Sequence, residues 1–394
     1  MKKLGFGLMR LPLIDPENPE SIDKEQLNKM VDHFLEEGFT YFDTAYPYHQ
    51  GKSEVAIRKA LVERYPRESF TLTDKLPTWI ATKYEDYEAI FEEQLERCGV
   101  THFDYYLLHS LDVKRYAETS KLGGFKFVKK LKEQGKIRHI GISFHDKAAL
   151  LDQILMEHPE IEYVQLQINY LDWDSELIQS GKCYEVATKH KRPVIVMEPV
   201  KGGYLANVPP EAVELFKKYN PDLSIASWAI RFAASLENVF MVLSGMSSFE
   251  QMADNVSVMK NFVPLNDEEM RIIKETVEII KKKVVIPCTA CRYCVDGCPK
   301  HIAIPEYFAI FNERKTFGPT PVQVFFYNNL AREHGKASDC IACGQCEEHC
   351  PQHIKIIDAL RDVAKELEAE KETTQGAKKM IKTEVSENTC LCDG

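Results

Sequence analysis

The chain has 394 residues and a formal net charge of −10 at pH 7, with 44% hydrophobic and 28% charged residues. This composition is typical of a globular protein and excludes intrinsic disorder as the main state, while the acidic balance argues against a nucleic-acid partner. No run of about 18 apolar residues is present and the N-terminal segment lacks the apolar stretch of a signal peptide, so we expect a cytoplasmic protein with no membrane partner.

Short β-branched runs alternate with longer amphipathic stretches over roughly the first 260 residues. Strands are expected at 5–9, 40–43, 70–75, 103–109, 138–143, 163–168, 193–198 and 239–245, with helices such as 23–36 and 87–98 between them. Successive strands end 32 to 34 residues apart at 43, 75, 109 and 143, which is the length of one strand plus one covering helix. The repeat predicts an α/β fold with a (β/α)8 TIM barrel over 1–283. A doubly wound open sheet is the alternative, but its G-x-G-x-x-G loop is absent.

Polar or ionisable side chains end several of the expected strands. They are Asp43, Lys75, His109, Ser143, Gln167 and Glu198. In a parallel barrel these strand ends surround one mouth, which is where the catalytic groups of such enzymes lie. Three ionisable groups ending consecutive apolar strands are costly unless they meet and pair. The alternative is that each side chain merely caps its own strand, but three in phase, with Tyr48 close by, favour an active site.

The sequence around these strand ends resembles the aldo-keto reductase family. The resemblance rests on YFDTAYPY at 41–48, GKSE at 51–54 and the opening strand GFGLMRL at 5–11, and it extends over residues 1 to about 280. It implies NADPH as the hydride donor and a small-molecule carbonyl as the substrate. The catalytic tetrad implied by the resemblance is Asp43, Tyr48, Lys75 and His109.

The chemistry of carbonyl reduction explains these residue types, because it needs a hydride at carbon and a proton at oxygen. Tyr48 would supply the proton, although the ordinary pKa of a tyrosine is about 10. The ammonium of Lys75 would favour the phenolate and lower that pKa, while Asp43 would keep Lys75 charged. A neutral His109 would orient the carbonyl oxygen.

The nicotinamide site departs from the family pattern. Phe144 replaces the asparagine that usually follows Ser143, and Met197 replaces a tyrosine that often stacks on the nicotinamide. Many members also place Lys and Arg after the eighth strand, where this chain lacks them. The expected cofactor contacts are Ser143, Gln167, Ser247, Gln251 and Asn255. We therefore expect binding of NADPH or NADH with little preference between them, unless Lys201 or Lys260 supplies the missing positive charge.

Eight of the twelve cysteines lie between residues 288 and 350, in two copies of C-x2-C-x2-C-x3-C-P offset by 52 residues. This pattern resembles a two-cluster bacterial-type ferredoxin, in which the cysteine before proline ligates the other cluster. Structural zinc is the alternative, but a tetrahedral site does not need a third cysteine at the same step or a fourth before proline. The resemblance implies one [4Fe–4S] cluster on Cys288, Cys291, Cys294 and Cys350, and a second on Cys340, Cys343, Cys346 and Cys298.

Helical patterns at 304–312 and 322–334 separate the two motifs and predict a small, mainly α-helical ferredoxin-like domain over 284–364. Residues 365–394 form a charged tail that we expect to fray into disorder, so its Cys390 and Cys392 are interpreted as incidental. Cys98 and Cys183 fall in helical patterns and are expected to be buried.

Three functions compete. The first is a nicotinamide-dependent carbonyl reductase fused to a two-[4Fe–4S] electron-transfer module. The second is a ferredoxin-coupled redox protein whose barrel binds a flavin or another cofactor, with the clusters relaying electrons to a partner protein. The third is non-enzymatic, with the clusters as a structural or oxidant-sensing module on a degenerate barrel, and the complete tetrad disfavours it. A nicotinamide passes two electrons as hydride whereas each cluster passes one, so a flavin would be needed to link them. Trp79, Tyr84 and Trp173 are candidate walls of the substrate site.

Overall fold

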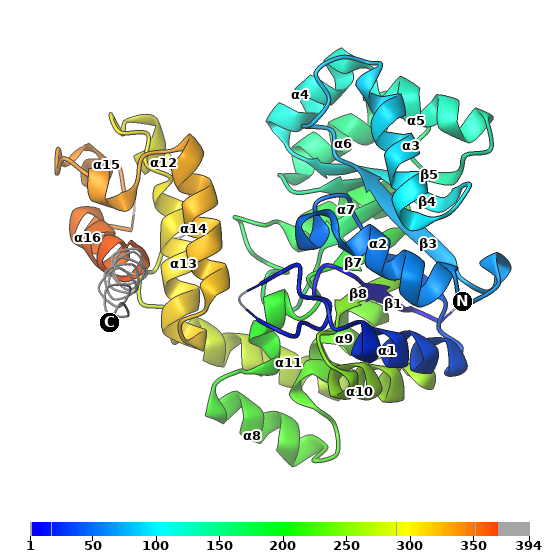
Figure 1. Ribbon diagram of the computed structural model, residues 1–394. Helices are drawn as coiled ribbons and strands as arrows, with labels where there is room; N and C mark the ends of the chain where they lie inside the picture. The colour runs from blue at the N-terminus through cyan, green and yellow to red at the C-terminus, as the bar shows by residue number, and fades with distance from the viewer. Residues whose placement is uncertain (1, 17, 289, 351, 369–394) are drawn as a thin grey trace, which may run out of the picture. The chain divides into compact units, whose positions relative to one another are not determined.

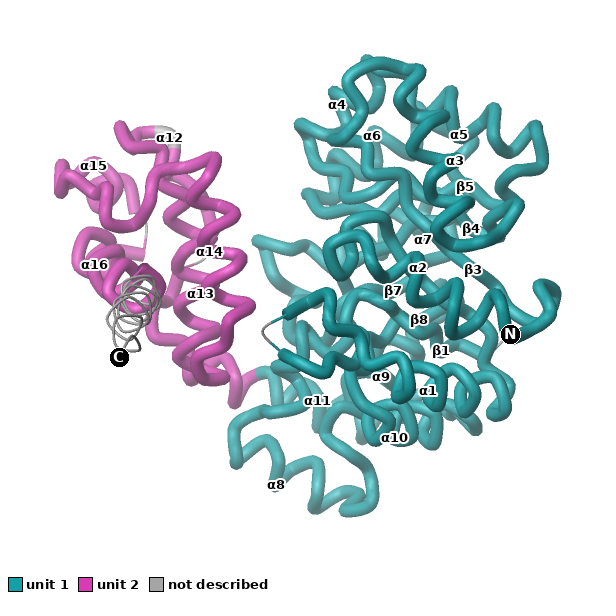
Figure 2. Tube along the Cα trace, viewed as in Figure 1, with its two compact units in different colours: residues 1–277 teal, residues 278–394 magenta. Residues whose placement is uncertain are grey.

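The computed structural model describes residues 2–16, 18–288, 290–350 and 352–368. The chain divides into two compact units, Met1–Val277 and Glu278–Gly394 (Figure 2). Most of the expected tail, with Cys390 and Cys392, lies outside the described residues. Among the described helices, none has both the length and the apolar character needed to cross a bilayer.

The first unit contains a closed barrel of eight parallel strands in sequence order, so the expected (β/α)8 fold is confirmed (Figure 1). The strands are β1 (Leu4–Gly7), β2 (Tyr41–Asp43), β3 (Thr71–Leu76), β4 (Phe103–Leu111), β5 (Ile137–Phe144), β6 (Tyr163–Gln167), β7 (Val194–Met197) and β8 (Val239–Gly245). The strand β4 continues past its expected end at His109, because its ladder with β5 resumes at Leu111 after an irregularity. Within that irregularity Ser110 adopts a left-handed conformation, with φ 61°.

Helices surround the barrel in Figure 1. They are α1 (Lys24–Glu36), α2 (Ser53–Ile57), α3 (Asp86–Cys98), α4 (Val113–Leu122), α5 (Gly124–Glu133), α6 (Ala148–Glu157), α7 (Ser180–Lys189), α8 (Pro210–Tyr219), α9 (Ile225–Ser235), α10 (Phe249–Lys260) and α11 (Asp267–Lys281). The first of them shows why these segments are helical. Asp23 accepts a hydrogen bond from the backbone of Gln26 at 3.0 Å and so caps α1. The buried residues of α1 recur at helical spacing, so one face packs inward: Leu27, Met30, Val31 and Phe34.

Large side chains from β2, β4, β6, β7 and β8 pack together as one buried cluster. Its members are Tyr41, Leu107, Tyr163, Ile195, Met241 and Leu243. A glycine on β5 makes room for one of these rings, since a Cβ at Gly141 would lie 2.3 Å from Cζ of Tyr163. Burying each such side chain stabilises the fold by about 1.5–3 kcal/mol. The strands are therefore held by a packed core, which leaves the strand ends free to carry polar groups.

The described part of the second unit consists of helices and turns, and part of this arrangement is repeated. They are α12 (Tyr293–Asp296), α13 (Ile304–Phe317), α14 (Pro321–Glu333), α15 (Gln345–Glu348) and α16 (Ile356–Leu367), with a 3₁₀ turn at Ala337–Asp339. The helices α12 and α13 begin 52 residues before α15 and α16, which is the offset of the two cysteine motifs. Buried residues from α13, α14 and α16, such as Tyr307, Phe308, Tyr327 and Leu360, form one apolar core. The mainly helical module expected from the sequence is thus confirmed.

Candidate functional site

A buried ion pair lies at the ends of β2 and β3. Nζ of Lys75 donates to Oδ1 of Asp43 at 2.5 Å and to the carbonyl oxygen of Thr44 at 2.6 Å. The amide of Gln165 donates to the other carboxylate oxygen of Asp43 at 3.2 Å. Burial alone would lower the pKa of Lys75, but Asp43 and Tyr48 outweigh it and hold that pKa above its ordinary value. Lys75 is therefore a fixed, charged ammonium in surroundings that exclude water.

Tyr48 begins the 3₁₀ turn Tyr48–Gly51 that follows β2. Nζ of Lys75 lies 4.8 Å from the centroid of its ring. Burial raises the pKa of Tyr48 above its ordinary value and outweighs the opposing effect of Lys75. The net lowering that the sequence led us to expect is therefore absent, because desolvation of a phenolate costs more than one nearby ammonium returns. The phenol therefore stays protonated at neutral pH.

His109 completes the group. Its ring centroid lies 6.1 Å from that of Tyr48, with the two rings nearly perpendicular at 81°. Burial, with a further contribution from Lys75, lowers the pKa of His109 well below its ordinary value, so the imidazole is neutral. Among the described residues its buried Nδ1 has no hydrogen-bond partner. A buried polar atom left in this way marks a place where a ligand group can bond.

An aromatic and a cationic side chain extend this group outward. The ring of Trp79, 39% exposed, lies 5.3 Å from the ring of His109. The guanidinium carbon of Arg115 lies 4.9 Å from the centroid of Trp79. Of the three candidate walls, Trp79 contacts the tetrad, whereas Tyr84 packs on Tyr87 and Phe127 and Trp173 packs on Tyr184 and Phe232. Arg115 was not predicted from the sequence. Its position in the first turn of the helix after β4, near the barrel mouth, could have marked it as a candidate for binding an anion.

The two residues expected to hold the nicotinamide carboxamide already have protein partners. Oγ of Ser143 accepts from the backbone N–H of Ser110 at 2.6 Å. The amide of Gln167 donates to Asp172 at 3.0 Å. Phe144 is buried, with 2% exposure, and its ring has no amide with which to replace the hydrogen bonds of an asparagine. Ser143 can still donate its hydroxyl proton, and Gln167 can still accept through its carbonyl oxygen and donate its second amide hydrogen.

A second ion pair, which is only partly buried, lies beyond β6 and was also missed from the sequence. Nζ of Lys201 lies 2.9 Å from one oxygen of Asp172 and 3.1 Å from the other. Asn169 donates to the same carboxylate at 2.8 Å. Lys201 and the glycines that follow it, Gly202 and Gly203, have positive φ angles of 48°, 66° and 102°. The pair therefore fixes a tight turn after β7.

The remaining expected cofactor contacts lie around the end of β8. Ser247 lies just before α10 and Gln251 in its first turn, and the backbone N–H of Ser247 donates to Oε1 of Gln251 at 2.8 Å. Asn255 is buried and donates to Oγ of Ser244 at 3.0 Å. Ser247 also donates to the backbone oxygen of Arg10 at 3.2 Å, and the Arg10 side chain lies 3.6 Å from Glu198. Arg10 thus supplies a cation beside these contacts that was not expected from the sequence.

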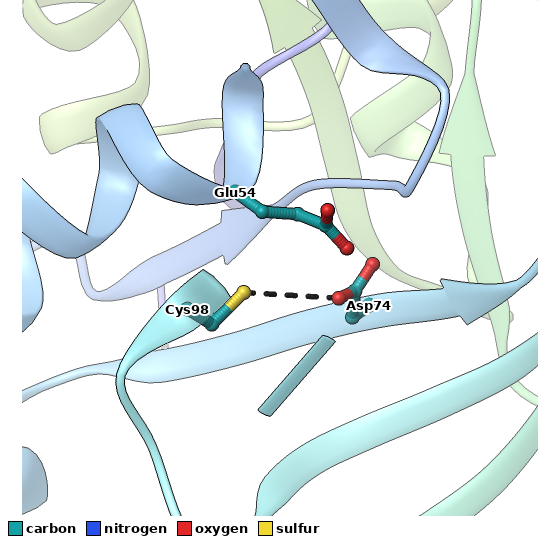
Figure 3. Close-up of side chains that lie close together, drawn as sticks. All are labelled: Glu54, Asp74 and Cys98. Atoms are coloured by element: carbon teal, nitrogen blue, oxygen red, sulfur yellow. Dashed lines mark hydrogen bonds between the residues drawn. The ribbon is translucent and has the colours of Figure 1, made fainter. Parts of the chain in front are cut away.

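A carboxyl pair lies on the other face of β3, behind Lys75. Figure 3 shows the side chains of Glu54, Asp74 and Cys98 converging, with the thiol 3.7 Å from Oδ2 of Asp74. Their potential ligand atoms lie within 4.8 Å of one another, but Arg97 donates to Glu54 at 3.0 Å and already supplies positive charge. Burial, with a further contribution from Glu54, raises the pKa of Asp74 well above its ordinary value. We interpret the group as two carboxyls sharing a proton, not as a metal site.

The cysteine motifs surround two separate hollows in the second unit. One hollow is lined by Cys288, Cys291, Cys294 and Cys350, and the other by Cys298, Cys340, Cys343 and Cys346. Each hollow thus takes three cysteines from one motif and the cysteine before proline from the other. Ile304 lines both hollows. Four sulfur donors in a largely apolar shell fit a [4Fe–4S] cluster.

The backbone explains how each motif turns its thiols toward a common centre. Ala290, Arg292 and His301 have positive φ angles of 54°, 67° and 50°. The same conformation recurs 52 residues later at Ala342, Gly344 and His353, with φ angles of 55°, 82° and 52°. Left-handed residues are costly unless the surrounding structure requires them. Their repetition indicates that both motifs wrap their sites in the same way.

The fold and the group at its mouth define an oxidoreductase of the (β/α)8 barrel class. The sequence profile of the aldo/keto reductase family matches residues 3–278, which is most of the chain, so the chain belongs to that family. A profile described as a 4Fe-4S dicluster domain matches residues 287–354, the range that holds all eight motif cysteines.

Individual relatives agree with this assignment. The chain is 26% identical over 290 residues to a 9,11-endoperoxide prostaglandin H2 reductase of Trypanosoma cruzi, covering 71% of this chain and 88% of that protein. It is 22% identical over 308 residues to the uncharacterized oxidoreductase YqkF of Bacillus subtilis, covering 70% and 92%. A solved aldo-keto reductase from Klebsiella pneumoniae in complex with NADPH shares the fold, with a TM-score of 0.55, 19% identity, and coverage of 69% of this chain and 90% of that chain.

Proposed function

We propose that the chain reduces a small carbonyl compound with a nicotinamide cofactor, that Tyr48 is the proton donor, and that the second unit carries two [4Fe–4S] clusters for electron transfer. The observation that carries this proposal is the position of Lys75, 2.5 Å from Asp43 and 4.8 Å from the Tyr48 ring. A buried ammonium in contact with both is what stabilises a phenolate after it has given up its proton.

Each member of the group has a defined part in this reaction. A nicotinamide, when bound, would supply the hydride for the carbonyl carbon. The hydroxyl of Tyr48 donates its proton to the carbonyl oxygen, and Lys75 stabilises the phenolate that is left. Asp43 keeps Lys75 charged and in place. The neutral imidazole of His109 donates a hydrogen bond that orients the carbonyl oxygen.

The cofactor contacts follow from the same arrangement. Ser143 and Gln167 would offer their remaining hydrogen-bonding capacity to the carboxamide, while Ser247, Gln251 and Asn255 would surround the adenosine end. The NADPH-bound Klebsiella relative supports a nicotinamide at this mouth. The eight motif cysteines would supply thiolates to iron in the two crossed sets.

A flavin in the barrel is the second candidate, and a specific observation favours it. Ser143 and Gln167 are already bonded to Ser110 and Asp172, and Phe144 replaces the usual amide. A flavin would also connect two-electron chemistry to the one-electron clusters, which would then relay electrons to a partner protein. Anaerobic purification followed by an absorption spectrum of the released cofactor decides between the two: flavin absorbance favours the second candidate, and a nicotinamide favours the first.

Cofactor preference is expected to be weak. The basic residues that could have bound a 2′-phosphate are all paired: Lys201 with Asp172, Lys260 with Glu37 at 2.5 Å, and Arg10 with Glu198 at 3.6 Å. Each charge-assisted hydrogen bond that is missing removes roughly 1.5–3 kcal/mol of preference. Titration of the purified protein should therefore show weak binding of both NADPH and NADH, with similar dissociation constants. A preference for NADPH above about a hundredfold, or roughly 2.7 kcal/mol, would contradict this expectation.

Replacement of Lys75 by methionine should remove both activity and stability. The variant leaves the buried carboxylate of Asp43 unpaired, which costs about 3–5 kcal/mol, and it removes the charge that stabilises the Tyr48 phenolate. The double variant Asp43→Asn with Lys75→Met removes both charges and should regain much of the stability in urea unfolding. It should remain inactive, so recovery of turnover along with stability would show that Lys75 acts through the fold alone.

A further inference from the structure

We propose that Arg115 selects carbonyl substrates that carry a carboxylate at the end remote from the carbonyl. The proposal rests on the reductase function above and names the chemical class of its substrate. It derives from a chain of contacts that leads outward from the tetrad through one aromatic ring to one guanidinium.

The contacts place the guanidinium at the far end of a substrate path. His109, at the inner end, is buried and orients the carbonyl oxygen. Trp79 lies 5.3 Å from the His109 ring and is 39% exposed, so it offers an apolar surface to whatever leads away from the carbonyl. The guanidinium carbon of Arg115 lies 4.9 Å from the Trp79 centroid. A planar spacer against Trp79 would bring an anionic group to Arg115.

The guanidinium of Arg115 is held in place by hydrogen bonds from one of its nitrogens, while its other donors have no partner among the described residues. Nη1 of Arg115 donates to the backbone oxygen of Ser110 at 3.1 Å and to Oγ of Ser110 at 2.8 Å. Nε and Nη2 have no hydrogen-bond partner within the part of the chain that the structure describes. A guanidinium fixed on one side loses little freedom when it binds a ligand on the other. Two free donors in a planar fork match the two oxygens of a carboxylate.

A purely structural role accounts poorly for this arginine. Arg115 is the third residue of α4, and a cation in the first turn opposes the helix dipole, so it does not stabilise the helix. Its ion pair with Asp112 is long, at 3.7 Å, and the other oxygen of Asp112 caps the helix by accepting from the Arg115 backbone at 2.8 Å. By contrast, Lys75 and Lys201 are bonded to their carboxylates at 2.5 and 2.9 Å. Arg115 thus keeps charge available for a ligand.

The test compares two aldehydes of nearly the same shape that differ in charge, para-carboxybenzaldehyde and para-tolualdehyde. We expect the wild-type protein to have the higher kcat/KM for the acid. In Arg115→Gln the ratio of the two kcat/KM values should fall by roughly 10- to 100-fold, the worth of a charge-assisted carboxylate contact. Arg115→Lys keeps the positive charge but loses the planar pair of donors, so its ratio of kcat/KM values should lie between those of the wild type and Arg115→Gln. Lys114→Gln removes a charge from the same turn and should keep the wild-type ratio.

Two results would overturn the proposal. One is a wild-type protein without preference for the acid. The other is an equal loss for both aldehydes in Arg115→Gln, which would make Arg115 a positioning residue for Ser110. If neither aldehyde is reduced, the reductase proposal has failed, and benzoate binding tests Arg115 alone. Tryptophan fluorescence that responds to benzoate in the wild type, but not in Trp79→Phe, reports this binding. Loss of the response in Arg115→Gln supports the anion site, and an unchanged response rejects it.

Discussion

Replacement of Tyr48 by phenylalanine is expected to abolish carbonyl reduction while leaving the fold and the cofactor affinity nearly unchanged. The change removes one hydroxyl and no packing volume, so Lys75 and Asp43 keep their 2.5 Å contact. Loss of a positioned general acid costs roughly 10²- to 10⁴-fold in rate. Steady-state turnover of a reducible aldehyde, the thermal midpoint and a cofactor titration check the three parts of this expectation.

A matched control lies two residues earlier on the same loop. The hydroxyl of Tyr46 donates to Glu93 at 3.1 Å and contacts none of the tetrad. Tyr46→Phe should therefore keep near wild-type turnover, whereas Tyr48→Phe loses it. Equal activity in the two variants would show that Tyr48 is not the proton donor and that another group protonates the carbonyl oxygen.

The second large effect concerns iron. Anaerobically purified protein should contain about eight irons and eight sulfides per chain, as two complete cluster motifs require. Cys298 precedes a proline in the first motif but lines the hollow of the second, together with Cys340 and two other cysteines. Cys298→Ser should therefore lower the iron content and alter the electron paramagnetic resonance signal of the cluster on the second motif, while the other cluster stays intact.

The control for this experiment is a cysteine outside both motifs. Cys183 is buried in α7, within the barrel unit, so Cys183→Ala should keep full iron content. Disruption of only the cluster on Cys288, Cys291 and Cys294 by Cys298→Ser would refute the crossed ligand sets. Zinc in place of iron in the wild-type protein would refute the clusters themselves.

The sequence predicted the barrel because the strands recur at the regular spacing that one strand and one covering helix require. The expected end of each strand lies close to the observed end, because the apolar run of a strand stops where the strand leaves the barrel core. That Asp43, Lys75 and His109 would meet also followed from the fold class, and they lie together around Tyr48; their roles remain predictions. Convergence at one mouth is a property of the topology, so it can be inferred before any contact is seen.

What the sequence could not predict depends on contacts between segments far apart in the chain. Lys201 was a candidate for the 2′-phosphate until its pairing with Asp172, 29 residues away, became visible. The interpretation of Arg115, which lies in α4, depends on its contact with Trp79 in the loop after β3. The sign of the pKa shift at Tyr48 required the extent of its burial, and burial depends on how several loops pack together. Motif spacing carries none of this information.

The carboxyl pair behind β3 couples the folding of the barrel to the uptake of a proton. In the unfolded chain Asp74 has the ordinary pKa of an aspartate, about 3.9, whereas in the folded chain burial and then Glu54 raise its pKa well above that value. Between these two pKa values the folded state binds more protons than the unfolded state. The contribution of Asp74 to the free energy of unfolding is therefore largest in acid and falls as the pH rises through this window. The strand that positions Lys75 is thus most stable at a pH where the buried carboxyl of Asp74 keeps its proton.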